Sequence, residues 1–300
     1  MNPDATPILL DTDIGTDIDD ALALSYLLCH PKCHLVGITT VGPEAGRRAD
    51  LARALCEAWG HRHVPVFAGH EPAAGLHDRR TAPWQADLLE VRPPPQTHDP
   101  RDAIDFLANV IPVYTGRITL VSIGPLTNLA RLVEANADAA ALLDAAVSMC
   151  GLYTAPPAEY GAVETNIGLD PEAAARVMKA RLPQHRVLGL EVTGAFALGC
   201  DELRSRLPKS VPRLLLALLD AWARRRKTVR FHDPMAAACV FAPELFTFGQ
   251  ARCEVSLAPR DAFGRTSAAR AGDDLPHRLL TRADYDAFVR HFCETLASRS

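Results

Sequence analysis

The sequence predicts a single α/β domain with a mostly parallel, Rossmann-like central sheet flanked by helices. Short apolar, β-branched segments alternate with segments of helical spacing between residues 7 and 192. This alternation favours a parallel sheet with helices on both faces. The first apolar segment ends in an acidic run, as expected where a buried strand brings polar groups to the C-terminal edge of a sheet. We therefore expect one domain over residues 1–300, with its active site at the C-terminal strand ends.

In the first part of the chain, residues 7–10, 35–41 and 64–69 are expected strands. Each is a short run of apolar and β-branched residues. Residues 21–28, 47–59 and 103–110 are expected helices. In the second of these, Leu51, Ala52 and Leu55 recur with helical spacing and predict a buried face.

In the second part, residues 118–122, 145–149 and 187–192 are expected strands for the same reason. The first leads into a Gly124-Pro125 turn and a helix from about Leu126. Asp170 and Pro171 predict another helix start, because Asp caps the N-terminus and Pro suits the first helical position.

Composition limits the possible partners and compartment. The net charge of −4 gives no electrostatic reason to expect nucleic acid, whose phosphates favour basic patches. No apolar stretch approaches the ~20 residues needed to span a membrane. The N-terminus lacks the basic and apolar regions of a secretory signal. The eight scattered cysteines include no Cys-x-x-Cys pair, so free thiols in a reducing cytoplasm are expected.

The acidic run over residues 11–20 is the strongest functional signal in the chain. Its five carboxylates belong to Asp11, Asp13, Asp17, Asp19 and Asp20. Such crowded acids raise one another's pKa unless a cation neutralises them. Oxygen ligands from several Asp residues suit Ca²⁺ or Mg²⁺ better than Zn²⁺. The alternative is a solvated acidic turn and helix N-cap, but the preceding strand and Gly15 at a tight turn favour an ion site.

Four further segments carry candidate functional groups. Residues 122–128 place a Gly-Pro turn after a strand, and Met149 ends the next one. Glu164 and Asn166 would share one side of an extended chain. His232 and Asp233 precede a predicted helix. Taken singly, each has an ordinary structural explanation, such as a helix cap or core packing.

Taken in order, these motifs resemble the inosine-uridine-type nucleoside hydrolases over residues 7–240. The family pattern is Asp-x-Asp-x-Gly…Asp-Asp, then Gly-Pro-Leu-Thr-Asn, then Glu-x-Asn before Asp-Pro-Glu-Ala, and finally His-Asp-Pro; each part occurs here. The resemblance implies bound Ca²⁺ and hydrolysis of the N-glycosidic bond of a ribonucleoside, as in purine or pyrimidine salvage. It also implies a homodimer or homotetramer.

The resemblance assigns roles to individual residues. It implies that the protein ligands of Ca²⁺ are Asp13, Asp20, Asp233 and the carbonyl of Ile123. It implies that Asp11 supports the cluster and that the ribose contacts Asp19, Glu164, Asn166, Asp233 and Met149. Asp13 is the candidate general base. His232 is either the acid that protonates the leaving base or a residue that orients Asp233.

The sequence also departs from the common family pattern. The spacing from Asp13 to Asp19 is longer and adds Asp17, which we expect to cap the following helix. Gly42-Pro43 stands where the family often has Asn, and residues 152–163 lack the Asn that often contacts the ribose 5′ end. These differences argue against ordinary inosine or uridine specificity and favour a substrate altered at the 5′ position or a weak hydrolase.

The leaving-group pocket and one basic run remain open to more than one interpretation. Trp222, Tyr153, Tyr160 and Phe231 are aromatic candidates for stacking on a base. Residues 224–227 fit the C-terminal turn of a helix, where cations are favoured, or a mobile lid that contacts a phosphate or an acidic substrate.

Two other function classes compete with a nucleoside hydrolase. A Mg²⁺-dependent phosphatase of the haloacid dehalogenase type also begins with Asp-x-Asp after a strand and would use Asp11 as nucleophile. However, Gly15 stands where that family normally has Thr or Val. A non-catalytic protein of the same fold would bind a ribosyl ligand without releasing a base.

Overall fold

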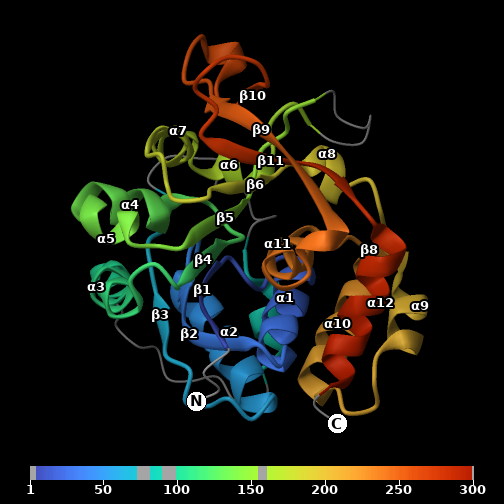
Figure 1. Ribbon diagram of the computed structural model, residues 1–300. Helices are drawn as coiled ribbons and strands as arrows, with labels where there is room; N and C mark the ends of the chain where they lie inside the picture. Colours follow the sequence, from blue (N-terminus) through green and yellow to red (C-terminus); the bar gives the residue numbers. More distant parts are fainter. Residues whose placement is uncertain (1–4, 73–81, 90–98, 155–160, 299–300) are drawn as a thin grey trace.

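A nine-stranded sheet forms the centre of the protein in a computed structural model that describes residues 5–72, 82–89, 99–154 and 161–298 (Figure 1). The strand order is β10-β9-β11-β6-β5-β4-β1-β2-β3. The strands are β1 (Thr6–Thr12), β2 (Cys33–Thr40), β3 (Val66–Ala68), β4 (Thr119–Ser122), β5 (Ala145–Met149), β6 (Arg186–Leu188), β9 (Phe246–Val255), β10 (Thr266–Ala269) and β11 (His277–Ala283). Two further short strands, β7 (Leu198–Gly199) and β8 (Thr228–Val229), pair antiparallel outside this sheet.

Helices connect and cover the strands. They are α1 (Asp19–Cys29), α2 (Ala45–Ala58), α3 (Pro100–Val110), α4 (Thr127–Ala135), α5 (Ala137–Ala141), α6 (Thr165–Leu169), α7 (Pro171–Lys179), α8 (Leu190–Thr193), α9 (Cys200–Arg206), α10 (Arg213–Arg225), α11 (His232–Phe241) and α12 (Tyr285–Ala297). Short 3₁₀ turns include η2 (Trp84–Leu88). None of the helices in these described segments is long and apolar enough to cross a membrane.

The sheet is mostly parallel, as predicted, and its strand order reverses at β1. Pairings among β1 to β6 are parallel, and β11 continues this arrangement beside β6. β1 lies between β2 and β4, so the connections that leave β1 and β4 run to opposite sides. In open parallel sheets, ligands bind outside the C-terminal strand ends at such a reversal. The segment after β1 is the acidic run.

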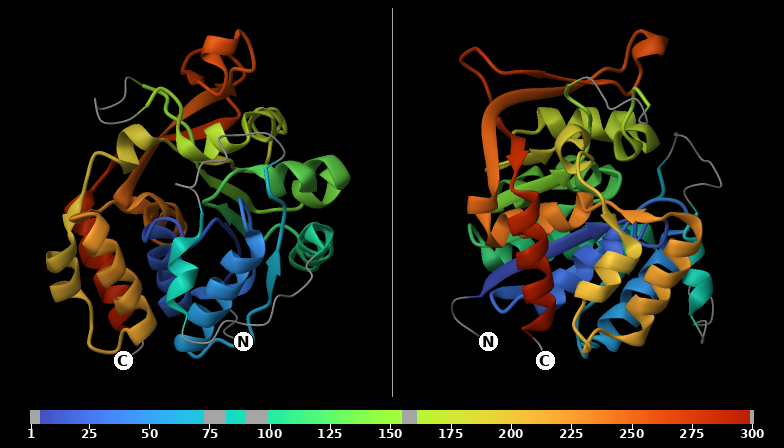
Figure 2. Two further views of the ribbon diagram at one scale, coloured as in Figure 1. Left: turned by 180° about the vertical axis from the view of Figure 1, so that it is seen from behind. Right: turned by 90° about the vertical axis from the view of Figure 1, so that its right-hand side faces the viewer.

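Alternating strand side chains build separate cores on the two faces of the sheet. Ile8 and Leu10 belong to the core under α1, α2, α11 and α12, whereas Leu9 belongs to the core under α3, α4 and α7. Figure 2 shows these helices as layers on either side of the strands. Burial on both faces explains why the strands are nearly continuous apolar runs.

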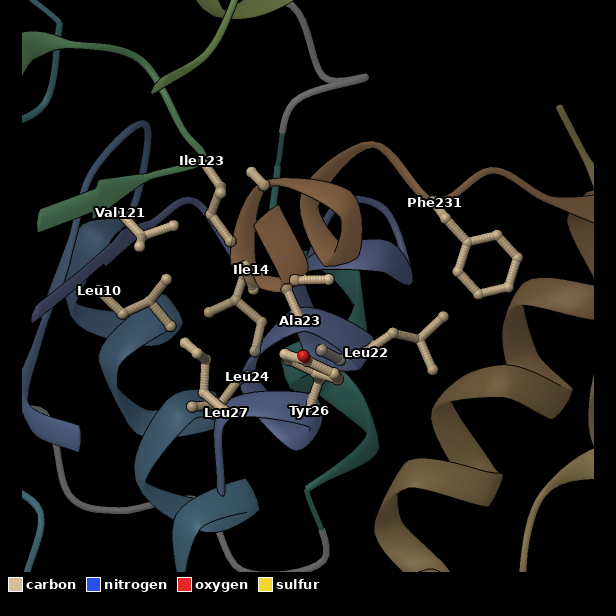
Figure 3. Close-up of a cluster of buried hydrophobic side chains, with 14 of the residues drawn as sticks. Leu10, Ile14, Leu22, Ala23, Leu24, Tyr26, Leu27, Val121, Ile123 and Phe231 are labelled. Atoms are coloured by element: carbon tan, nitrogen blue, oxygen red, sulfur yellow. The ribbon is translucent and has the colours of Figure 1, made fainter. Parts of the chain in front are cut away.

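Helix α1 is buried along its whole length. It packs against α11 and also contacts β2, while α11 contacts β5. Leu22, Ala23 and Tyr26 point into the surrounding core (Figure 3). Ile14 and Ile123, from the segments that follow β1 and β4, enter the same cluster. The start of α1 is therefore held rigidly at the C-terminal edge of the sheet.

Most predicted elements are confirmed, with small shifts at their ends. The strand at residues 145–149 matches β5, and Asp170 caps α7 by accepting a hydrogen bond from the Ala173 N–H at 3.1 Å. The predicted strand at residues 187–192 is wrong in its second half. β6 ends at Leu188, and Leu190 to Thr193 form α8, whose Glu191 carboxylate accepts a hydrogen bond from the Tyr153 N–H.

Candidate active site

Three buried carboxylates meet at the C-terminal edge of the sheet beside β1. Asp19 and Asp20 are the first residues of α1, and Asp233 lies in the first turn of α11. Oxygens of these three side chains lie within 4.8 Å of one another. Helix N-termini stabilise negative charge, so the packing of α1 against α11 builds an anionic centre from two helix ends.

The electrostatics of this cluster demand a compensating charge. Burial raises the pKa of Asp19, Asp20 and Asp233 well above the usual range of a carboxyl group, and the neighbouring acids raise each further. Buried like charges this close persist only with a bound cation or with bound protons. The donors are all oxygen, which fits a hard divalent cation. The Thr12 hydroxyl donates a 2.5 Å hydrogen bond to Asp20 Oδ1 and fixes its orientation.

Asp13 adjoins this cluster without being one of its three members. It lies in the turn between β1 and α1, and its charge raises the pKa of Asp19, Asp20 and Asp233. The structure thus brings together two of the predicted metal ligands, Asp20 and Asp233. It adds Asp19, which the family resemblance assigned to the ribose, and leaves Asp13 beside them.

The carbonyl of Ile123 lies on the neighbouring strand end but is already hydrogen-bonded. Asn166 Nδ2 donates to this carbonyl at 2.9 Å and to the Met149 carbonyl at 3.0 Å. Asn166 therefore fastens the ends of β4 and β5 to each other. A carbonyl oxygen has a second lone pair, so the Ile123 carbonyl keeps one acceptor position.

Glu164 is a helix cap in this structure. Its carboxylate accepts hydrogen bonds from the backbone N–H groups of Gly151, Asn166 and Ile167. The predicted extended segment with Glu164 and Asn166 on one side is wrong, because α6 begins at Thr165 and this capping stabilises the helical turn. Burial nevertheless raises the pKa of Glu164 to about 7.

Asp11 supports the turn from within the sheet. Its Oδ1 accepts hydrogen bonds from Thr39 Oγ1 at 2.6 Å and from Asn128 Nδ2 at 2.7 Å. Burial raises the pKa of Asp11 to about 7. Asn128 also donates to the Thr40 carbonyl and accepts from the His70 N–H. The last residue of the Gly-Pro-Leu-Thr-Asn motif thus ties β1, β2 and α4 together, a role that the motif itself could have indicated.

His232 stands next to the acidic cluster and contacts α8. Its Nδ1 lies 2.9 Å from Thr193 Oγ1. Burial, with the positive charge of Arg230, lowers the pKa of His232 to about 4, so the ring is neutral near pH 7 in the free protein. A neutral ring suits the orienting role, while proton donation requires that substrate binding restores the proton.

Arg48 is a buried contact of the turn that sequence reasoning missed. Its guanidinium donates hydrogen bonds to the carbonyls of Asp13 and Ile14. A signal was present in the sequence, because Arg48 precedes Leu51 and Leu55 by three and seven residues and so lies on the buried face of α2.

The added residues of the acidic turn contact η2, which itself contacts α10. Trp84 Nε1 donates to the Thr16 carbonyl at 2.8 Å, and the Arg225 guanidinium lies 3.9 Å from the Trp84 ring centre. Asp17 is not the N-cap of α1: that position is Ile18, and Asp17 Oδ1 accepts a hydrogen bond from the Ile18 N–H at 2.6 Å. Burial raises the pKa of Asp17 to about 6. Residues 224–227 do lie at the end of α10, as predicted.

The aromatic candidates have different surroundings. Phe231 is fully buried and packs edge-on against Phe288 and Phe292, so it serves the core. Trp222 Nε1 donates to the Thr228 carbonyl, which holds β8 beside α10. Tyr153 has a buried hydroxyl. Tyr160 lies outside the described residues.

The parallel sheet, its reversal at β1 and the buried acids define an α/β protein with an acidic triad at its C-terminal strand edge that could hold a metal ion. The model of the family "Inosine-uridine preferring nucleoside hydrolase" matches residues 8–290. The chain belongs to this family. The alternative of a haloacid dehalogenase-type phosphatase is therefore wrong.

Individual relatives span nearly the whole chain. The sequence is 32% identical to "Non-specific ribonucleoside hydrolase RihC" of Klebsiella pneumoniae, over 97% of this chain and 98% of that protein. It is 28% identical to "Uridine nucleosidase 1" of Arabidopsis thaliana, over 80% of this chain and 75% of that protein. The purine-preferring ribonucleoside hydrolase from Gardnerella vaginalis has the same fold, with a TM-score of 0.79, 23% identity and 98% coverage of both chains.

Proposed function

We propose that this protein is a Ca²⁺-dependent hydrolase of the N-glycosidic bond of a ribonucleoside, giving free base and ribose. The observation that carries the proposal is the buried cluster of Asp19, Asp20 and Asp233 at the strand-order reversal. Family membership supplies the reaction class.

The residues fit the charge that such a reaction develops. Cleavage at C1′ of a sugar passes through an oxocarbenium-like transition state with positive charge. A buried group of carboxylates stabilises that charge as it forms. Asp19, Glu164, Asn166 and Asp233 are our candidates for binding the ribose hydroxyls, and Met149 for lining the sugar pocket.

A calcium ion would be held by Asp13, Asp20, Asp233 and the Ile123 carbonyl, with Asp19 in reach. When bound, Ca²⁺ supplies positive charge that orients hydroxyl groups and lowers the pKa of a bound water. Asp13, next to the cluster, is our candidate general base that accepts the proton of the attacking water. His232 either donates a proton to the leaving base or holds Asp233 in place.

Base release with and without calcium tests this proposal directly. Purified protein is stripped with a chelator and incubated with a panel of purine and pyrimidine ribonucleosides, and free base is quantified by chromatography. We expect release that depends on added Ca²⁺ and stops with excess chelator. Calcium binding without release from any of them would favour a ribosyl-binding protein; equal release in chelator would refute the calcium requirement.

The panel should include ribonucleosides modified at the ribose 5′ position. Gly42-Pro43 replaces the Asn common in the family at the end of β2. Faster release from a 5′-modified nucleoside than from inosine or uridine would support an altered specificity. Equal or slower release would contradict a preference for 5′-modified substrates.

We further propose a cytoplasmic salvage enzyme that forms a homodimer or homotetramer, with one domain over residues 1–300. Light scattering during gel filtration would distinguish these assemblies from a monomer, and fractionation of the producing cells would test the compartment.

A further inference from the structure

Arg48 is the largest side chain that is completely buried within the described residues. It lies on the face of α2 that otherwise carries apolar residues such as Leu51 and Leu55. A buried guanidinium is costly unless its donors are paired. Its partners therefore indicate why this position holds an arginine.

Those partners are in the turn that carries the acidic run. Nη1 donates to the Asp13 carbonyl, to the Ile14 carbonyl at 3.2 Å and to Thr16 Oγ1 at 3.1 Å. Nε donates to the Pro43 carbonyl at 2.8 Å. One side chain thus joins the turn after β1 to the turn after the neighbouring strand β2.

The space around this contact is tightly filled. A Cβ atom at Gly42, whose φ is +93°, would lie 3.4 Å from Arg48 Nε and 3.5 Å from the Cβ of Asp13. A Cβ atom at Gly124 would lie 2.9 Å from the Asp13 backbone nitrogen. The two glycines let the chain approach closely, so that the turn is enclosed by the ends of β2 and β4 as well as by Arg48.

The charge and the hydrogen bonds of Arg48 have opposite consequences for a cation. A fixed positive charge beside the carboxylates repels an incoming Ca²⁺. The planar guanidinium holds several backbone and side-chain acceptors of the turn and so keeps the carboxylates in place. Because the turn is already ordered, cation binding costs less conformational entropy. Lysine would keep the charge but could not reproduce the planar fork.

We propose that Arg48 is a positioning residue, which holds the turn at residues 13–16 in the shape that receives the divalent cation. This inference rests on the proposed function because it assumes cation binding at the cluster. Arg48 raises the affinity for the cation through its hydrogen bonds to the turn. This gain outweighs the repulsion between the guanidinium and the cation.

Calorimetric titration of Ca²⁺ into chelator-stripped protein tests the inference without relying on turnover. The wild type is compared with Arg48→Lys, Arg48→Met and Thr16→Val, each at a temperature well below its own unfolding midpoint. We expect Arg48→Lys and Arg48→Met to bind Ca²⁺ about 10- to 100-fold more weakly, the range typical for residues that orient metal ligands. Thr16→Val should show a smaller loss, since it removes one acceptor of the fork.

Arg53→Met is the matched control. Arg53 is on the same helix and also donates to a backbone carbonyl, that of Val66, at 2.7 Å. It should keep the wild-type calcium affinity even if its unfolding midpoint falls, because a purely structural loss does not change binding by the folded protein.

The outcomes separate this inference from the proposed function. Unchanged affinity in Arg48→Lys, or unchanged or tighter binding in Arg48→Met, would overturn the positioning role alone. Tighter binding in Arg48→Met would show that the repulsion by its charge is the dominant effect. Failure of the wild type to bind calcium would overturn the metal assignment, and the role of Arg48 with it.

Discussion

The carboxylates of Asp19, Asp20 and Asp233 share a space from which water is largely excluded. Their pKa values are raised by burial and by one another. Asp13 contributes to the same field, and its own pKa is also raised, chiefly by burial. Each of these side chains is therefore expected to affect cation binding as well as the reaction.

Asp13→Ala should abolish calcium binding and turnover together. It removes a proposed ligand and the candidate base, and loss of a general base alone reduces rates by roughly 10²- to 10⁴-fold. Calcium titration and base release measure the two effects on the same sample. Asp50→Ala is the control, because Asp50 pairs with Arg53 on α2. Near-normal turnover in Asp13→Ala would refute its role as base and ligand.

His232→Ala separates the two roles proposed for this ring. If His232 protonates the leaving base, the variant should lose about 10²- to 10⁴-fold in release of a natural base. It should lose much less with nitrophenyl riboside, whose leaving group needs no proton. Steady-state rates with both substrates decide the matter, with exposed His63→Ala as the control. Equal losses would assign His232 to orienting Asp233.

At the level of elements, the arrangement of the strand ends depends on side chains that form hydrogen bonds between them. Asn128 joins Asp11 on β1 to the Thr40 carbonyl on β2, and Thr127 Oγ1 donates to the Asp170 carboxylate at the start of α7. The Gly-Pro-Leu-Thr-Asn motif therefore braces the strand ends behind the site through the hydrogen bonds of Thr127 and Asn128. It also directly follows Ile123, whose carbonyl is a candidate metal ligand.

Asn128→Ala should lower the free energy of unfolding by about 3 kcal/mol. It removes three hydrogen bonds, after which Asp11 and the Thr40 carbonyl keep the Thr39 hydroxyl and the Gly69 N–H as partners, while the His70 N–H loses its acceptor. Each lost hydrogen bond contributes roughly 0.5–1.5 kcal/mol. Urea unfolding followed by circular dichroism measures the change. Gln184→Ala removes exposed hydrogen bonds to Asp144 and should stay within about 0.5 kcal/mol of wild type. A similar small change in Asn128→Ala would show that the brace is dispensable.

Local sequence rules predicted the elements whose signals are themselves local. The apolar run at residues 145–149 and the Asp170-Pro171 start of α7 need only strand propensity and capping. The rule failed at Glu191, where a tertiary hydrogen bond to Tyr153 favours a helical turn. The antiparallel strands β9 and β10 were not predicted, because most of their residues are exposed or half-buried and they lack the continuous apolar run of a strand buried on both faces.

In the candidate site, too, some residues could be predicted from the sequence and others depend on tertiary contacts. Asp20 and Asp233 could be assigned as ligands only through the family motifs, since Asp20 and Asp233 are far apart in sequence and meet through the packing of α1 on α11. The contacts of Arg48 are tertiary and no motif describes them, although an arginine among the apolar residues of the α2 face was a signal in the sequence. Asn128 belongs to a motif, but its partners Asp11 and Thr40 could be identified only from the fold.

For the whole molecule, stability should depend on a buried histidine pair remote from the acidic run. His185 and His277 pack edge to face with ring centres 5.2 Å apart, and His185 Nε2 lies 2.9 Å from Ser148 Oγ. Burial lowers the pKa of His185 to about 3. The unfolded chain thus binds more protons than the folded chain between about pH 6.5 and 3, so this contribution is complete above pH 6.5 and is lost as the pH falls.

Wild type and His185→Gln should therefore differ in their pH dependence. Between pH 7.5 and 5, wild type should lose about 2 kcal/mol more of its free energy of unfolding than the variant, from 1.36 kcal/mol for each unit over which the protonation differs. Urea unfolding across this range measures it, with exposed His63→Gln as the control. Parallel curves for wild type and His185→Gln would show that folding does not lower the pKa of His185.

The position of Trp84 gives the protein a built-in optical reporter. Its indole N–H is bonded to the Thr16 carbonyl and its ring faces the Arg225 guanidinium, whereas Trp59 is bonded to Ser25 and Trp222 to the Thr228 carbonyl. Indole emission responds to nearby charge and hydrogen bonding. A rearrangement of the acidic turn would reach a fluorophore directly, so the occupancy of the site can be followed in real time in the unlabelled protein.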